Sequence, residues 1–410
     1  MRPLAAVGAG VLVIAAIVLA VALAPPPRSD TSPSPAAISA LPSASVTVPP
    51  SASPVSSTPA PTPTQPADLA SLLHPLVTSW QPSGPFLVVE HSDPQGWTVL
   101  AVPLAGRATP LVTLVGLVQL GYDMRDDGSV LAAALMTTTQ TSRIAIWDLA
   151  SGTTRWLTED EPGVRHSTPV WSEDGTFVYY SAHMYSAQAN RLIDLGIFRI
   201  RSDGTGKTRV RAPEESGAHL SGLTPDGRGL LWSRLRAGGA VEVLDLVSGQ
   251  NRSFDETTTA SLLSWRRAQP RALVMVGGCC AGRPGGSLAL WNDATGSRKI
   301  LIGAESTPPT RVLSASWEPL GVRFAAAIIE SPTIDYFGTI SIFDSDGRRL
   351  AALAGTEGTQ QVFWLPMGIV FMRPRDTGGT EIMIVPESGG QPARIFEDAT
   401  SMFIRSVAGP

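Results

Sequence analysis

The segment Thr168-Pro-Val-Trp-Ser-Glu-Asp-Gly-Thr-Phe-Val-Tyr-Tyr-Ser181 contains the pattern that decides the fold. Trp171 precedes Gly175 by four residues, and a run of aromatic and β-branched residues follows the glycine. Such a run after turn residues is typical of a β-strand, and glycine permits the positive φ that a tight turn often requires. The segment therefore predicts two antiparallel strands joined by a short turn.

This slot, a large apolar residue shortly before a turn, recurs at intervals of 42 to 52 residues. It is filled by Trp80, Met124, Trp171, Leu223, Trp265, Trp317 and Trp364. A second turn recurs in step with it, at Gly106, Gly152, Gly204, Gly249, Gly296, Gly347 and Gly389. Strand-like runs lie between the turns, so each copy holds four strands, which is typical of one blade of a β-propeller.

We therefore expect residues 67–410 to form an all-β, seven-bladed propeller, with six or eight blades as the alternatives. A Trp near the end of an innermost strand fills the wedge between neighbouring blades, so the slot tryptophans are predicted to be core. Ring closure has two solutions. Trp80 suggests that the first blade supplies its own innermost strand, whereas residues 401–407 are strand-like and can enter the first blade. We favour the second.

The segments at 168–181 and 223–233 resemble the repeat of TolB-like (PD40) propellers, which are related to WD40 folds and to the propeller of prolyl oligopeptidases. The resemblance covers about residues 76 to 396. It implies a propeller with a protein-binding or gating role and carries no catalytic residues across. A prolyl oligopeptidase would add a hydrolase domain with a G-x-S-x-G motif, and neither that motif nor the length for such a domain follows Phe396.

The N-terminal region divides into two segments of different composition. Residues 4–24 are uncharged and apolar, and as a helix they would span about 31 Å, the thickness of a bilayer core. We expect residues 1–24 to be a transmembrane anchor, with a cleaved signal peptide as the alternative. Residues 25–66 are rich in Pro, Ser and Thr and predict a disordered stalk. The propeller is then expected outside the cytoplasm.

Charge and motifs exclude several classes of protein. The net charge of −4 lacks the basic excess of a nucleic-acid binder. Neither a Walker loop nor an HExxH pattern occurs, so we expect no cofactor and no metal. The expected partner is another envelope protein or a cell-wall component, bound by a monomeric propeller.

Binding is expected on the face that carries the irregular loops, because loops on a rigid scaffold usually carry function. These loops are residues 182–195, 277–286 and 331–337. The candidate contacts are His183, Tyr185, Arg191, Arg283, Asp335, Tyr336, Arg373 and Arg375.

Adjacent cysteines, Cys279 and Cys280, lie in one of these loops between glycines. In an oxidising exterior they can close a strained vicinal disulfide. Two reduced thiols are the alternative.

These observations favour a membrane-anchored, non-catalytic binding or sensing module, and the chain is not expected to be an enzyme. The alternative is a propeller hydrolase or lyase that acts on envelope carbohydrate through acidic residues at the central channel. An enzyme of that kind predicts two or more inward carboxylates within about 10 Å. A binding module predicts an axis lined by small apolar residues.

Overall fold

A computed structural model describes residues 68–93, 96–115, 120–186, 191–214, 217–224, 226–234, 241–253, 260–266, 271–277, 286–292, 295–303, 310–319, 322–330, 337–400 and 402–408. The predicted anchor (1–24) and stalk (25–66) lie outside these ranges. Within them, no helix has the length and hydrophobicity needed to span a membrane. The unit described below is Pro66–Pro410.

Among the described residues of this unit, all regular structure is β-strand apart from the 3-10 turn η1 (Leu69–Ser71). The strands form six hydrogen-bonded sheets. One sheet has five strands: β1 (Leu73–Pro75), β2 (Phe86–Asp93), β3 (Gly96–Pro103), β4 (Thr109–Leu114) and β29 (Met402–Ala408). Another has eight: β5 (Tyr122–Met124), β6 (Val130–Met136), β7 (Ser142–Asp148), β8 (Thr154–Trp156), β9 (Val164–Trp171), β10 (Phe177–Ser186), β11 (Arg191–Arg201) and β12 (Thr208–Arg211).

Four further sheets have four strands each, in chain order. The first two contain β13 (Ala218–Leu223), β14 (Gly229–Arg234), β15 (Val241–Asp245), β16 (Asn251–Ser253), and then β17 (Ala260–Arg266), β18 (Arg271–Val276), β19 (Ser287–Asn292), β20 (Ser297–Ile302). The last two contain β21 (Arg311–Trp317), β22 (Arg323–Ile329), β23 (Thr339–Asp344), β24 (Arg349–Ala352), and then β25 (Gln361–Leu365), β26 (Gly368–Pro374), β27 (Thr380–Val385), β28 (Ala393–Asp398).

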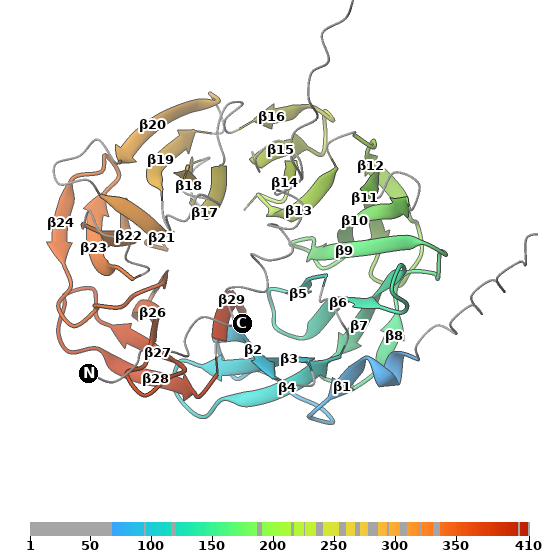
Figure 1. Ribbon diagram of the computed structural model, residues 1–410, viewed down its shortest axis with the longest axis horizontal. Helices are drawn as coiled ribbons and strands as arrows, with labels where there is room; N and C mark the ends of the chain where they lie inside the picture. The colour runs from blue at the N-terminus through green and yellow to red at the C-terminus, as the bar shows by residue number, and fades with distance from the viewer. Residues whose placement is uncertain are drawn as a thin grey trace, which may run out of the picture. The chain divides into compact units, whose positions relative to one another are not determined.

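The sheets follow one another around a ring, with β5, β9, β13, β17 and β29 nearest its centre (Figure 1). The fold is therefore an all-β propeller, as predicted. The expectation of seven separate blades is wrong for the hydrogen-bonded sheets: five have the size of one blade, and the sixth has eight strands. The reason is a parallel contact between β7 and β9, at Ser142 and Arg165, which joins two antiparallel groups of four strands.

The C-terminal strand closes the ring. β29 pairs antiparallel with β2, so the last strand of the chain becomes the innermost strand of the first sheet. This confirms the favoured closure. Trp80 lies outside any strand and instead packs edge-on against Phe86, with ring centroids 4.8 Å apart. Its place in the repeat pattern was misleading, because β29 already occupies the innermost position.

The slot tryptophans pack between successive sheets. Trp171, Trp317 and Trp364 end or nearly end the innermost strands β9, β21 and β25, and each is at most 5% exposed. Trp364, for example, shares a hydrophobic cluster with Ile340 and Ile342 of the preceding sheet. A large apolar residue at this position thus buries the contact between two sheets, as the repeat predicted.

Candidate functional site

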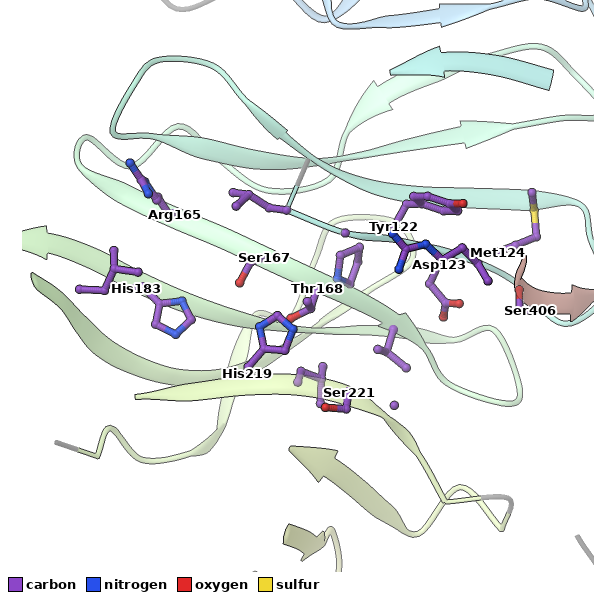
Figure 2. Close-up of a pocket in the computed structure, with 18 residues that line it drawn as sticks. Tyr122, Asp123, Met124, Arg165, Ser167, Thr168, His183, His219, Ser221 and Ser406 are labelled. Atoms are coloured by element: carbon purple, nitrogen blue, oxygen red, sulfur yellow. The ribbon is translucent and has the colours of Figure 1, made fainter. Parts of the chain in front are cut away.

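A cavity of about 650 Å³ lies between the innermost strands β5, β9, β13 and β29. Figure 2 shows the side chains that line it, on both sides of β9. Its charged and titratable lining residues are Tyr122, Asp123, Arg165, His183, His219 and Arg405. These residues come from five strands, β5, β9, β10, β13 and β29, so the cavity exists only once the ring has closed.

β-Bulges present polar residues to the cavity. The pairing of β9 with β10 shifts near Thr168, the pairing of β13 with β14 shifts at Ser221, and that of β29 with β2 shifts at Arg405. A bulge adds one unpaired residue and re-aims side chains locally. All three of these residues line the cavity.

Thr168 has an unusual backbone conformation. Its φ is +48°, and it is the one non-glycine residue with positive φ among those described. A β-branched residue in this region is strained, and such strain clusters at functional sites. Thr168 sits at the cavity wall between Ser167 and Pro169, which also line it.

Asp123 is the carboxylate in the described part of the cavity wall. Its Oδ2 accepts a hydrogen bond from the backbone N–H of Trp171 at 2.9 Å. Burial raises the pKa of this carboxyl from 3.8 to about 7, and the hydrogen bond from Trp171 opposes that rise. A carboxyl with a pKa near neutrality can both donate and accept a proton at physiological pH.

An ion pair reaches the same cavity through Arg405, which lines it. The guanidinium of Arg405 donates from Nε and Nη2 to the two carboxylate oxygens of Glu90, each at 2.8 Å. The Glu90 side chain is fully buried, whereas that of Arg405 is 54% exposed. Burial and the charge of Glu90 raise the pKa of the neighbouring Tyr122 hydroxyl well above its usual range, so this phenol stays protonated.

Two histidines complete the polar wall. His183 is buried on β10, and its Nε2 donates to the carbonyl oxygen of Ala218 at 2.7 Å. Burial lowers the pKa of His183, and burial together with His183 lowers that of His219. Both imidazoles are therefore neutral at pH 7 and contribute hydrogen bonds without charge.

Of the contact residues predicted from the sequence, the structure places His183 in the cavity wall. His183 and Tyr185 lie on β10, and Arg191 begins β11, so the expected loop 182–195 is largely an extended hairpin. The correction has a simple cause: the two strands keep pairing to Ser186 and Arg191, beyond the length predicted for them. Of these three residues, His183 lines the cavity.

The remaining predicted contacts lie elsewhere. Arg373 donates from Nε to Glu381 at 2.7 Å, and Arg375 pairs with Glu397 at 3.4 Å. Neither residue lines the cavity. Arg283, Asp335, Tyr336, Cys279 and Cys280 fall outside the described residues, so the binding prediction and the vicinal-disulfide hypothesis stay open for them.

The sequence did not lead us to predict Asp123, Arg165 or Arg405, because binding residues were expected in loops and these three lie on innermost strands. One feature of the sequence does distinguish Asp123. Asp123 directly precedes the slot residue Met124, whereas the equivalent position before Trp317 is Ser316 and that before Trp364 is Phe363. A carboxylate in an innermost strand, where the equivalent residues are uncharged, indicates a candidate functional residue.

No family model matches this chain. No curated protein matches it either. Among solved structures it is similar to a puromycin-hydrolyzing peptidase from Mycobacterium tuberculosis, with 18% identity, 82% of this chain and 55% of that chain covered, and a TM-score of 0.51.

Prolyl oligopeptidase B from Galerina marginata is also similar, with 12% identity, 76% of this chain and 51% of that chain covered, and a TM-score of 0.53. TolB from Acinetobacter baumannii has 18% identity, with 65% of this chain and 62% of that chain covered and a TM-score of 0.43. This chain thus spans about half the length of the two peptidases. At these identities the likeness shows the propeller fold alone.

The comparisons nevertheless correct one expectation. A non-catalytic binding or sensing module, and a chain that is not an enzyme, were expected. The solved structures that share the fold at the higher TM-scores are peptidases, which contradicts that expectation.

Proposed function

We propose that this propeller belongs to a hydrolase and binds its substrate in the central cavity, where Asp123 exchanges a proton with the substrate. The observation that carries the proposal is the Asp123 carboxyl, with a pKa of about 7, in the wall of a 650 Å³ cavity. A cavity that combines polar groups with a shifted pKa is a reason to propose an active site there.

The neighbouring groups support this chemistry. The half-exposed guanidinium of Arg405 offers hydrogen-bond donors to a substrate oxygen that becomes negative during hydrolysis. Glu90 holds that guanidinium in place through two hydrogen bonds. Neutral His219 adds a second group able to donate or accept a hydrogen bond at the same wall.

The substrate class follows from the number of carboxylates. Most glycosidases need two carboxyl groups that flank the bond to be broken. Asp123 is the single Asp or Glu among the described lining residues. We therefore propose amides or esters rather than carbohydrate as substrates, in keeping with the peptidase chemistry of the structural neighbours.

A second candidate is that the cavity binds the substrate while another part of the enzyme supplies the nucleophile. One observation favours it: this chain spans about half the length of the peptidases it resembles and contains no G-x-S-x-G motif. Under this candidate, Asp123 orients the substrate and does not exchange a proton with it.

The experiment is a hydrolysis assay of the full chain against chromogenic amides, esters and glycosides. We expect turnover of amides or esters, and a loss of about a hundredfold or more in kcat/KM for Asp123→Asn. Asp346→Asn is the matched control, because Asp346 lies in an exposed turn. An absence of turnover, or an Asp123→Asn enzyme as active as wild type, contradicts the first candidate.

We also propose that the ring has seven modules, with the eight-stranded sheet counted as two blades, β5–β8 and β9–β12. The support is that a single parallel residue pair joins the two groups, whereas each group is antiparallel within itself. A hydrophobic cluster containing Val130 and Trp171 lies between them, like the clusters between other sheets.

Location and partners are proposed on sequence alone. Residues 4–24 would anchor the chain in a membrane, and the propeller would act outside the cytoplasm with a component of the envelope as its partner. Protease accessibility of the propeller in intact cells tests this placement.

A further inference from the structure

The cavity has two chemically different ends. Figure 2 shows Arg165 and His183 at one end and Asp123 and Met124 at the other, with β9 between them. Arg165 lies six residues before Trp171, whose N–H binds Asp123. Six residues of a strand span about 20 Å. A ligand that touches both ends is therefore elongated, about the length of six residues of extended chain.

The two arginines of the cavity differ in how their charges are balanced. Arg405 is neutralised by Glu90 through two hydrogen bonds of 2.8 Å. Arg165 donates from Nη2 to the neutral carbonyl oxygen of Thr139 at 2.7 Å. No Asp or Glu oxygen of the described residues pairs with its guanidinium within 4.0 Å. The bond to Thr139 is exposed, so the guanidinium is accessible to solvent and can form charge-assisted hydrogen bonds with an anionic ligand.

The surroundings of Arg165 restrict the kind of anion. Burial lowers the pKa of His183, so its imidazole is neutral at pH 7. The nearby Arg211 pairs with Asp194 at 3.1 Å, so Arg165 is the arginine at this end without a carboxylate partner among the described residues. Leu192 lines the same end and is 39% exposed. A planar guanidinium beside an apolar side chain suits the carboxylate of an organic molecule better than a small hydrated inorganic ion.

We propose that the cavity binds an elongated peptide whose terminal carboxylate pairs with Arg165, so that Arg165 selects free acids over their neutral amides. Bond cleavage near Asp123 rests on the proposed function, whereas recognition of the carboxylate by Arg165 does not. Arg165 is a specificity-determining residue in this arrangement and takes no part in proton exchange.

The test measures binding and hydrolysis separately on the full chain. Immobilised wild-type protein is offered an equimolar library of N-acetylated hexapeptides, half with a free C-terminal carboxylate and half with a C-terminal amide. We expect the free acids to be retained about ten- to a hundredfold better, since hydrogen bonds to charged groups have this strength. Arg165→Gln should abolish that preference and Arg165→Lys should keep part of it.

Two controls make the outcome decisive. Arg349 lies on the outer strand β24 and pairs with Glu330. The Arg349→Gln variant should leave the preference for free acids unchanged. Asp123→Ser should stop hydrolysis and keep the preference, so failure of the proposed reaction is seen apart from failure of this inference. Equal retention of acids and amides, retention of neither, or an unchanged preference in both Arg165 variants would overturn the proposal.

Discussion

Asp123 accepts a hydrogen bond from the backbone N–H of Trp171 at 2.9 Å, from one innermost strand to the next. Ser316 does the same for Trp364, also at 2.9 Å and also 48 residues further along the chain. Both acceptors directly precede a slot residue, and both donors are slot residues. A serine therefore suffices for this bond between blades, and the carboxylate of Asp123 exceeds what the fold requires.

The first prediction separates the structural role of Asp123 from its chemical role. At about pH 4, where the folded protein holds the Asp123 carboxyl protonated, Asp123→Ser should keep the bond to Trp171 and change the free energy of unfolding little. Hydrolysis should be lost at every pH. Ser316→Ala removes the equivalent bond and should cost about 1 kcal/mol of stability without loss of hydrolysis. Urea unfolding and the amide assay together measure both effects. A Ser316→Ala protein that loses hydrolysis would speak against this separation.

The second prediction concerns pH. Folding raises the pKa of Asp123 from 3.8 to about 7, so the folded state binds this proton more tightly than the unfolded state. The contribution of Asp123 to stability is therefore fully present below about pH 4 and declines as the pH rises to about 7. The free energy of unfolding of Asp123→Ser, relative to wild type, should increase over this interval and then level off. A flat difference between pH 4 and 7 would show that Asp123 titrates normally.

Ring closure provides the third prediction. Arg405→Gln leaves the fully buried carboxylate of Glu90 without its cation and should cost about 3 kcal/mol. Glu90→Gln combined with Arg405→Gln should recover much of that loss, because no buried charge is left unpaired. Arg348→Gln is the control, since its pair with Asp344 is exposed and worth little. The midpoints of urea unfolding compare the wild type, Arg405→Gln, the double variant and Arg348→Gln. A double variant as unstable as Arg405→Gln would contradict the argument.

The fourth prediction tests the strain at Thr168. Asparagine tolerates positive φ better than a β-branched residue, so Thr168→Asn should raise the free energy of unfolding by about 1 kcal/mol. Thr208→Asn, in the outer strand β12, should not stabilise the protein, because β-branched residues favour strands. If the strain serves binding, Thr168→Asn should also weaken retention of the hexapeptide library. Equal stability changes at both positions would argue against strain.

Local patterns in the sequence were enough to predict the propeller. Trp171, Trp317 and Trp364 each precede a turn by the same number of residues. The strand patterns between turns can likewise be recognised from a few consecutive residues. They do not report hydrogen bonds between repeats, so the link from Ser142 to Arg165, which merges two groups of strands, could not be foreseen. Trp80 shows the same limit, because a local motif cannot tell that a distant strand has taken its place.

The class of fold, the repeat and the apolar residues between blades could be predicted from the sequence, because each depends on neighbours close in the chain. The location of the polar groups depends instead on contacts between distant segments. Glu90 and Arg405 are 315 residues apart and meet through the closing strand β29. The pKa of Asp123 is likewise set by burial among strands from separate repeats, a property of the closed ring that no short segment possesses.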